Sequence, residues 1–187
     1  MDDDRRTLLA AGTAALLAAD TQAQALASGR PPNIPEGRPG EFDFLSGEWR
    51  IHHRWRSGPD SSEWLEFDGE ATVIGILGGI CSVEELRIPA RNFYGMGLRL
   101  LDQQNKVWND HWVNKQSGVV TAPGQLGGFV DGAGTWSSTW TDENERAWIS
   151  EGIWDEITPN STRWRQRVSS DGGITWEETW IMHWRRV

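Results

Sequence analysis

Hydrophobic and polar residues alternate with period two along much of the chain from Trp49 to its end. At the start of this region Trp49, Ile51, His53 and Trp55 fall on one face, while the residues between them are charged or polar, mostly arginine. Alternation of this kind is typical of β-strands with one face buried and the other in water. We therefore expect a first strand here, with its tryptophan-bearing face directed inward.

Similar patterns recur in seven further segments, separated by turn-forming sequences rich in Gly, Pro, Asn and Asp. These segments are 63–76, 81–88, 94–101, 107–114, 146–157, 162–168 and 174–186, and the glycine-rich stretch 124–134 is harder to assign. No amphipathic helix of any length interrupts them. The pattern predicts an all-β fold, a single antiparallel up-and-down β-barrel of roughly 8–10 strands, because closure removes exposed strand edges. A β-sandwich is the alternative.

The chain before residue 42 has a different character. Arg5 and Arg6 precede an Ala/Leu-rich segment with A-x-A sequences near its end, the plan of an export signal of the twin-arginine type over residues 1–27. Residues 28–41 contain four prolines and predict an extended tether that contributes nothing to stability. The barrel domain is then 42–187. Export predicts a periplasmic or secreted location, and a short amphipathic helix of a cytoplasmic protein is the alternative.

Composition narrows the classes of partner. The formal net charge is -9, which argues against a nucleic-acid surface, and no apolar run approaches the ~20 residues of a membrane-spanning helix. The single cysteine, Cys81, excludes an intrachain disulfide. The four histidines show no H-x-H spacing, so we expect no metal and no cofactor. A monomer or homodimer is expected.

The chain resembles an uncharacterised bacterial family of tryptophan-rich, calycin-like barrels. The resemblance runs from about Phe42 to the C-terminus and rests on several short motifs. They are Phe42-Asp43-Phe44 with Gly47-Glu48-Trp49, Gly79 and Cys81 with Glu85, Trp108 with Trp112-Val113-Asn114, Ser170-Asp171-Gly172-Gly173 with Thr175-Trp176, and Arg185-Arg186. The resemblance implies a lipocalin-like or nitrobindin-like architecture, with a Gly-x-Trp start whose tryptophan closes one end of the barrel. It implies no activity.

All 13 tryptophans lie from Trp49 onward, so the expected lumen is lined with indoles. Apolar walls with a few convergent polar groups are typical of a binding site. We predict a small-molecule ligand, aromatic or amphipathic. The predicted ligand-binding residues are Trp49, Trp55, Trp108, Trp112, Asn114, Trp148, Trp154, Trp164, Gln166, Glu178 and Trp180.

The polar residues predicted to face inward leave a second function open. Glu85, His53 and Asp110 would be the acid–base groups of a cofactor-independent enzyme of proton-transfer type, an isomerase, cyclase or hydrolase. A carboxylate desolvated by indole rings has a raised pKa and can carry a proton near neutral pH. A more remote alternative is a haem-binding, nitrobindin-like barrel with His183 as ligand, although strand alternation places His183 on the outer face.

Overall fold

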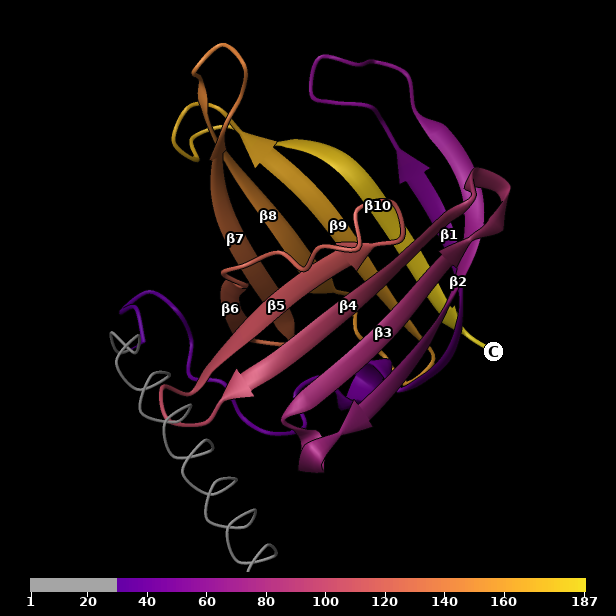
Figure 1. Ribbon diagram of the computed structural model, residues 1–187, viewed down its shortest axis with the longest axis vertical. Helices are drawn as coiled ribbons and strands as arrows, with labels where there is room; N and C mark the ends of the chain where they lie inside the picture. Colours follow the sequence, from indigo (N-terminus) through magenta and orange to yellow (C-terminus); the bar gives the residue numbers. More distant parts are fainter. Residues whose placement is uncertain (1–29) are drawn as a thin grey trace, which may run out of the picture. The chain divides into compact units, whose positions relative to one another are not determined.

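Ten antiparallel strands form a closed barrel in the computed structural model, which describes residues 30–187 (Figure 1). The strands are β1 (Gly47–Trp55), β2 (Leu65–Ile76), β3 (Cys81–Ile88), β4 (Phe93–Asp102), β5 (Val107–Asn114), β6 (Gln125–Val130), β7 (Ala133–Thr141), β8 (Ala147–Asp155), β9 (Ser161–Ser169) and β10 (Glu177–Arg186). Each pairs with its neighbours in sequence, and β10 pairs with β1. This confirms the all-β, up-and-down barrel and excludes the sandwich. The export signal predicted at 1–27 lies outside the described residues.

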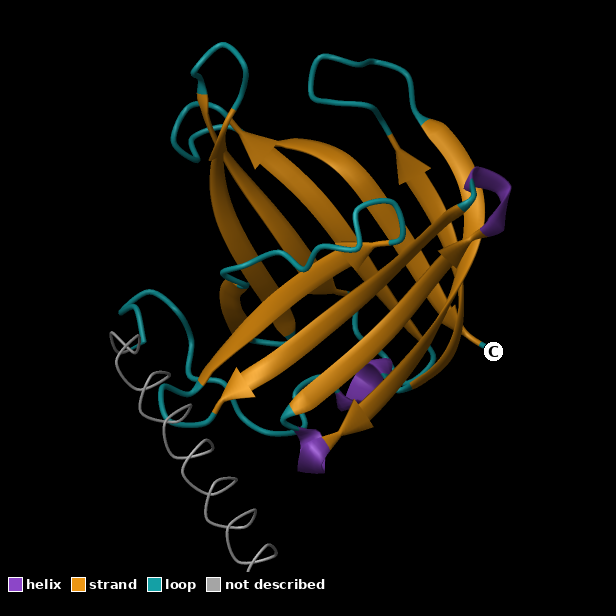
Figure 2. Ribbon diagram, in the orientation of Figure 1, coloured by secondary structure: helices purple, strands orange, loops and turns teal. Residues whose placement is uncertain are grey.

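Three short 3-10 helices are the only helical elements in residues 30–187 (Figure 2). They are η1 (Asp43–Leu45), η2 (Leu77–Gly79) and η3 (Pro89–Arg91). Within this part of the chain no helix is long and apolar enough to cross a membrane.

The end of the barrel at η1 is closed by Trp49. Its indole Nε1 donates to the Leu45 carbonyl at 2.6 Å, and the Arg186 guanidinium lies 4.2 Å from the centre of its ring. Arg186 also donates to the carbonyls of Ser46 and Phe44. A cation over an indole face is attracted by the ring quadrupole. The closure of one barrel end by Trp49, which the resemblance implied, is confirmed, and Arg186 covers its ring.

The alternation predicted for β1 is confirmed. Trp49, Ile51 and His53 are buried, whereas Arg50 and His52 are exposed. Gly69 in β2 lies opposite Ile51 of β1 in the ladder. A side chain there would come within 2.7 Å of the His53 ring, so the glycine makes room for the buried histidine.

Two predicted inward residues lie on the outside of the barrel. Glu85 in β3 is 61% exposed and forms an ion pair with Arg87 at 2.8 Å, because the buried face of β3 carries Glu84 and Leu86 instead. Glu178 in β10 is 40% exposed and pairs with Arg165, because a bulge between Glu178 and Trp180 shifts the alternation of the strand. The predictions that Glu85 and Glu178 face the lumen are therefore wrong.

The segment before the barrel does not behave as a free tether. The Gly37 amide donates to the Lys106 carbonyl at 2.8 Å, and Glu41 accepts a hydrogen bond from the Trp108 indole at 2.8 Å. Gly37 is buried so tightly against Trp108 that an added Cβ would come within 2.8 Å of that ring. Residues 35–41 therefore contact the barrel, whereas the sequence predicted an extended tether that contributes nothing to stability.

The strand ladder between β5 and β6 is the shortest in the barrel. It has only three residue pairs and ends at Asp110 opposite Gln125. Beyond that point the loop 115–124 replaces a strand, and the teal segment in Figure 2 crosses this part of the wall. The loop is fastened to β5 by Thr121, whose amide donates to the Trp112 carbonyl and whose hydroxyl accepts from the Trp112 amide. On this side of the barrel the strand ladder between β5 and β6 is not continuous, and the loop 115–124 forms the wall there.

Candidate functional site

A cavity of about 270 Å³ lies inside the barrel. Five indoles form its apolar walls: Trp112, Trp154, Trp164, Trp180 and Trp184. Its polar lining comes from β3, β4, β5, β6, β8, β9 and the loop 115–124: Glu84, Arg99, Asp110, His111, Thr121, Gln125, Ser150 and Gln166. Tryptophan walls with several polar groups among them have the character of a ligand pocket rather than of a core built only for stability.

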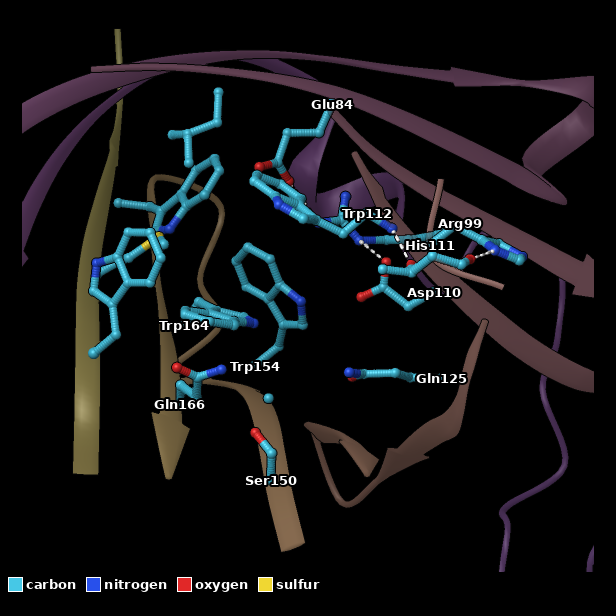
Figure 3. Close-up of a pocket in the computed structure, with 16 residues that line it drawn as sticks. Glu84, Arg99, Asp110, His111, Trp112, Gln125, Ser150, Trp154, Trp164 and Gln166 are labelled. Atoms are coloured by element: carbon cyan, nitrogen blue, oxygen red, sulfur yellow. Dashed lines mark hydrogen bonds and ion pairs between the residues drawn. The ribbon is translucent and has the colours of Figure 1, made fainter. Parts of the chain in front are cut away.

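An ion pair lies at one wall of this cavity (Figure 3). Nη2 of Arg99 donates to Oε2 of Glu84 at 2.5 Å, and the two side chains are only 5% and 4% exposed. The guanidinium carbon lies 5.2 Å from the centre of the Phe42 ring and 5.4 Å from that of Trp154. Arg99 is thus held between two aromatic rings and one buried carboxylate.

Asp110 lies beside this pair, with Oδ1 3.9 Å from Nε of Arg99, too far for a hydrogen bond. Within residues 30–187 nothing donates a hydrogen bond to its carboxylate. Figure 3 shows the Asp110 side chain directed toward the space bordered by Trp154 and Gln125. The cavity therefore contains a carboxylate that is free to accept a hydrogen bond from a ligand.

The electrostatics of the group follow from this burial. Burial raises the pKa of Asp110 from 3.8 to about 6, although the positive charge of Arg99 opposes the rise. For Arg99, burial lowers the pKa, but Glu84 and Asp110 outweigh it and the net direction is upward. Arg99 therefore stays charged, while Asp110 can gain or lose a proton near neutral pH.

Six of the residues predicted for the site do line the cavity: Asp110, Trp112, Trp154, Trp164, Gln166 and Trp180. The others lie elsewhere. Trp49 closes the barrel end, and Trp108 is buried near that end against Phe42. Trp148 stacks on Trp140 with the rings 5.6 Å apart, and Arg91 covers Trp55.

Asn114 has a structural task, since its side-chain oxygen accepts a hydrogen bond from the Ser117 amide in the turn after β5. His53 is fully buried and does not line the cavity. Its Nδ1 accepts a hydrogen bond from the Trp180 indole at 3.2 Å. Burial, helped by the neighbouring His52, lowers the pKa of His53 from 6.5 to about 4, so the ring is neutral at neutral pH. With Glu85 on the outer surface, the structure does not bring Glu85, His53 and Asp110 together.

The polar residues that sequence reasoning missed are Glu84, Arg99, His111, Thr121, Gln125 and Ser150. A signal for Arg99 existed in β4, where Gly95 and Gly97 share its face. A Cβ at Gly97 would lie 3.1 Å from Nη2 of Arg99, so that face has glycine where a large inward group needs space.

His183, the candidate haem ligand, is exposed on the outer face of β10, opposite His52 of β1. It therefore cannot reach a haem inside the lumen. Among residues 30–187 no group of three or more His, Cys, Asp or Glu side chains is placed to hold a metal ion.

Comparison with known proteins gives a likeness of fold only. No family model matches the chain, and no curated protein matches it. It is similar to a crystal structure of a protein of unknown function from the DUF3598 family of Nostoc punctiforme, with a TM-score of 0.43 and 15% sequence identity. The match covers 83% of this chain and 53% of that one, so this chain spans about half the length of that protein. The ten-stranded antiparallel barrel itself fits a calycin-like domain.

Proposed function

We propose that this protein binds a small aromatic or amphipathic molecule in the lumen of its barrel. The observation that carries the proposal is the cavity of about 270 Å³ between five indoles and a set of buried polar groups. Its volume lies just below the roughly 300–1,000 Å³ of pockets for drug-sized ligands, so the ligand is a small one. Indoles provide flat apolar contact, and the polar wall at Asp110 gives the ligand a preferred orientation.

The cavity can be tested with a pair of matched substitutions. Ser150→Leu puts a larger side chain into the cavity, whereas Ser137→Leu makes the same change at an exposed position of the neighbouring strand β7. Binding of a panel of small aromatic dyes is followed by quenching of tryptophan fluorescence. We expect Ser150→Leu to weaken binding at least tenfold and Ser137→Leu to leave it unchanged. A panel without any binder, or equal binding by both variants, would overturn the lumen as the site.

We also propose that the protein acts outside the cytoplasm, in the periplasm or the medium. The arginine pair, the apolar segment and the A-x-A sequences of residues 1–27 support this location. Carrying or sensing small molecules is a suitable function for an exported barrel.

A second candidate is a cofactor-independent proton-transfer enzyme, favoured by one observation. Asp110 faces the cavity with a pKa raised to about 6 by burial, in the range suited to a general base or acid. Arg99 and Glu84, rather than Glu85 and His53, would be its neighbours. The test is whether molecules that bind are recovered unchanged. Conversion that Asp110→Asn abolishes would favour the enzyme, and recovery of every bound molecule unchanged would favour the binding protein.

A further inference from the structure

We propose that the lumen selects a small organic cation, an aromatic ring carrying a protonated amine, with Asp110 as the partner of the ammonium group. This inference rests on the proposed binding function and names the class of ligand. It follows from the charge balance of the cavity, the free carboxylate, and the aromatic walls.

The ionisable groups that line the cavity are two carboxylates, one guanidinium and the imidazole of His111. Arg99 is committed to Glu84 by the hydrogen bond at 2.5 Å, and only its Nε approaches Asp110, at 3.9 Å. With both carboxylates ionised and the His111 ring uncharged, the pocket carries one unbalanced negative charge. Since charges interact strongly in a poorly solvated interior, a ligand cation is favoured there and a ligand anion is disfavoured.

Asp110 supplies the contact point for such a cation. Its side chain is 24% exposed, and this exposed part faces the cavity, where no described residue donates a hydrogen bond to it. An ammonium group has three N–H donors and no acceptor, and it would form a charge-assisted hydrogen bond with this carboxylate. A neutral apolar ligand would leave the carboxylate desolvated and without a partner.

The unpartnered N–H groups of Arg99 do not make this an anion site. Its Nε and Nη1 atoms are buried, so a ligand in the cavity does not reach them. The guanidinium carbon lies over the rings of Phe42 and Trp154. Its charge is balanced by Glu84, which occupies the Nη2 side.

The walls suit the remainder of such a molecule. In Figure 3 Trp164 lies across the cavity from Asp110, with Trp154 nearer to Asp110, and Trp180 packs edge-on against Trp164 with the ring centres 5.9 Å apart. Indole is the side chain that interacts best with a cation, and it also stacks on aromatic rings. Ammonium and ring would therefore both find favourable surfaces.

Three probes of nearly equal shape and different charge test the inference: phenethylamine, 2-phenylethanol and phenylacetate. Binding to the full chain is measured by titration calorimetry at pH 7.5. We expect phenethylamine to bind at least tenfold more tightly than 2-phenylethanol, and phenylacetate to bind least. Asp110→Asn removes the preference for the amine. Glu85→Gln, which removes a carboxylate on the outer face of β3, leaves that preference intact.

Tighter or equal binding of the alcohol or the acid would overturn the inference, and the wild-type ranking tests it even if Asp110→Asn does not fold. A folded Asp110→Asn variant that still prefers the amine would overturn the role of Asp110. If none of the three probes binds while the dye panel does, the choice of ligand class is wrong and the binding function stands. If the panel also fails, the proposed function fails with it.

Discussion

Replacing Arg99 by methionine tests whether the charged group in the lumen is held together by this one residue. The change keeps much of the side-chain volume but removes the guanidinium from between Glu84 and Asp110. Glu84 is 4% exposed and Asp110 24% exposed, so one buried and one partly buried carboxylate would remain without a positive partner. Removing one partner of a buried ion pair costs about 3–5 kcal/mol. For a domain of this size, that corresponds to a fall in Tm of roughly 6–20 °C.

Arg87 provides a matched control on the neighbouring strand. It also pairs with carboxylates, Glu70 at 3.0 Å and Glu85 at 2.8 Å, but these partners are 53% and 61% exposed. Exposed ion pairs contribute about 0–1 kcal/mol each. Arg87→Met is therefore expected to cost about 0–2 kcal/mol, less than the loss for Arg99→Met.

The assay is urea unfolding followed by tryptophan emission, with the free energy of unfolding compared for the wild type and the two variants. A third variant, Glu84→Leu with Arg99→Met, removes the pair together and should recover part of the loss, because one buried charge disappears. If Arg99→Met is as stable as Arg87→Met, the inner ion pair does not stabilise the fold and the reasoning from burial is refuted.

Three further predictions follow from other parts of the chain. A chain beginning at Arg38 should melt about 2–8 °C below one beginning at Ser28, because it lacks the hydrogen bond from Gly37 to Lys106 and the packing on Trp108; equal melting temperatures would contradict this. Burial raises the pKa of Asp110 from 3.8 to about 6, so its protonated form stabilises the fold below pH 3.8 and this contribution is lost as the pH rises through 6. Relative to wild type, Asp110→Asn should therefore gain stability between pH 4 and pH 7, by at most about 3 kcal/mol, and a difference that is constant with pH would count against the shift. Changing Arg5 and Arg6 to lysine should retain the precursor in the cytoplasm, as fractionation would show; unaltered export would point to the general secretory route.

The architecture was predictable from sequence because the tryptophans mark the buried face so plainly. In β1 and β9, arginines alternate with aromatic or aliphatic residues, and the structure places the two sets on opposite sides of the wall. Arg163, for example, pairs with Asp155 on the outside, while Trp164 lines the cavity. Where such contrast exists, period two is sufficient to assign the faces.

The predictions failed where both faces of a strand carry residues of mixed character. In β3, alternation from Cys81 and Val83 puts Glu85 on the inward face. The larger apolar side chains, Leu86 and Ile88, are on the opposite face and are buried, and Glu84 shares their face. In β4, Leu98 and Leu100 flank Arg99, so simple alternation would send the arginine outward. The glycines at 95 and 97 indicate space on the face of Arg99, but its partner Glu84 lies on another strand, and strand pairing is not visible in one sequence.

The bulge in β10 illustrates a second limit. Trp180, Met182 and Trp184 face inward as predicted. The irregular position between Glu178 and Trp180 exchanges the inward and outward faces for the residues before it, so Glu178 faces outward. Since a shift of one residue exchanges the two faces of a strand, a single bulge turns a predicted lumenal carboxylate into a surface one.

The short ladder between β5 and β6 has a consequence for how the interior meets solvent. Only three residue pairs join these strands, and beyond Asp110 the wall continues as the loop 115–124. Local opening of a loop needs far less free energy than breaking a strand ladder, so deuterium should replace the amide protons of this seam long before those of β1 or β9. A molecule can then reach Asp110 by displacing the loop at Thr121 while the other nine strand junctions stay intact. A ligand would then enter and leave the barrel on this one side, between β5 and β6, while the rest of the wall stays closed.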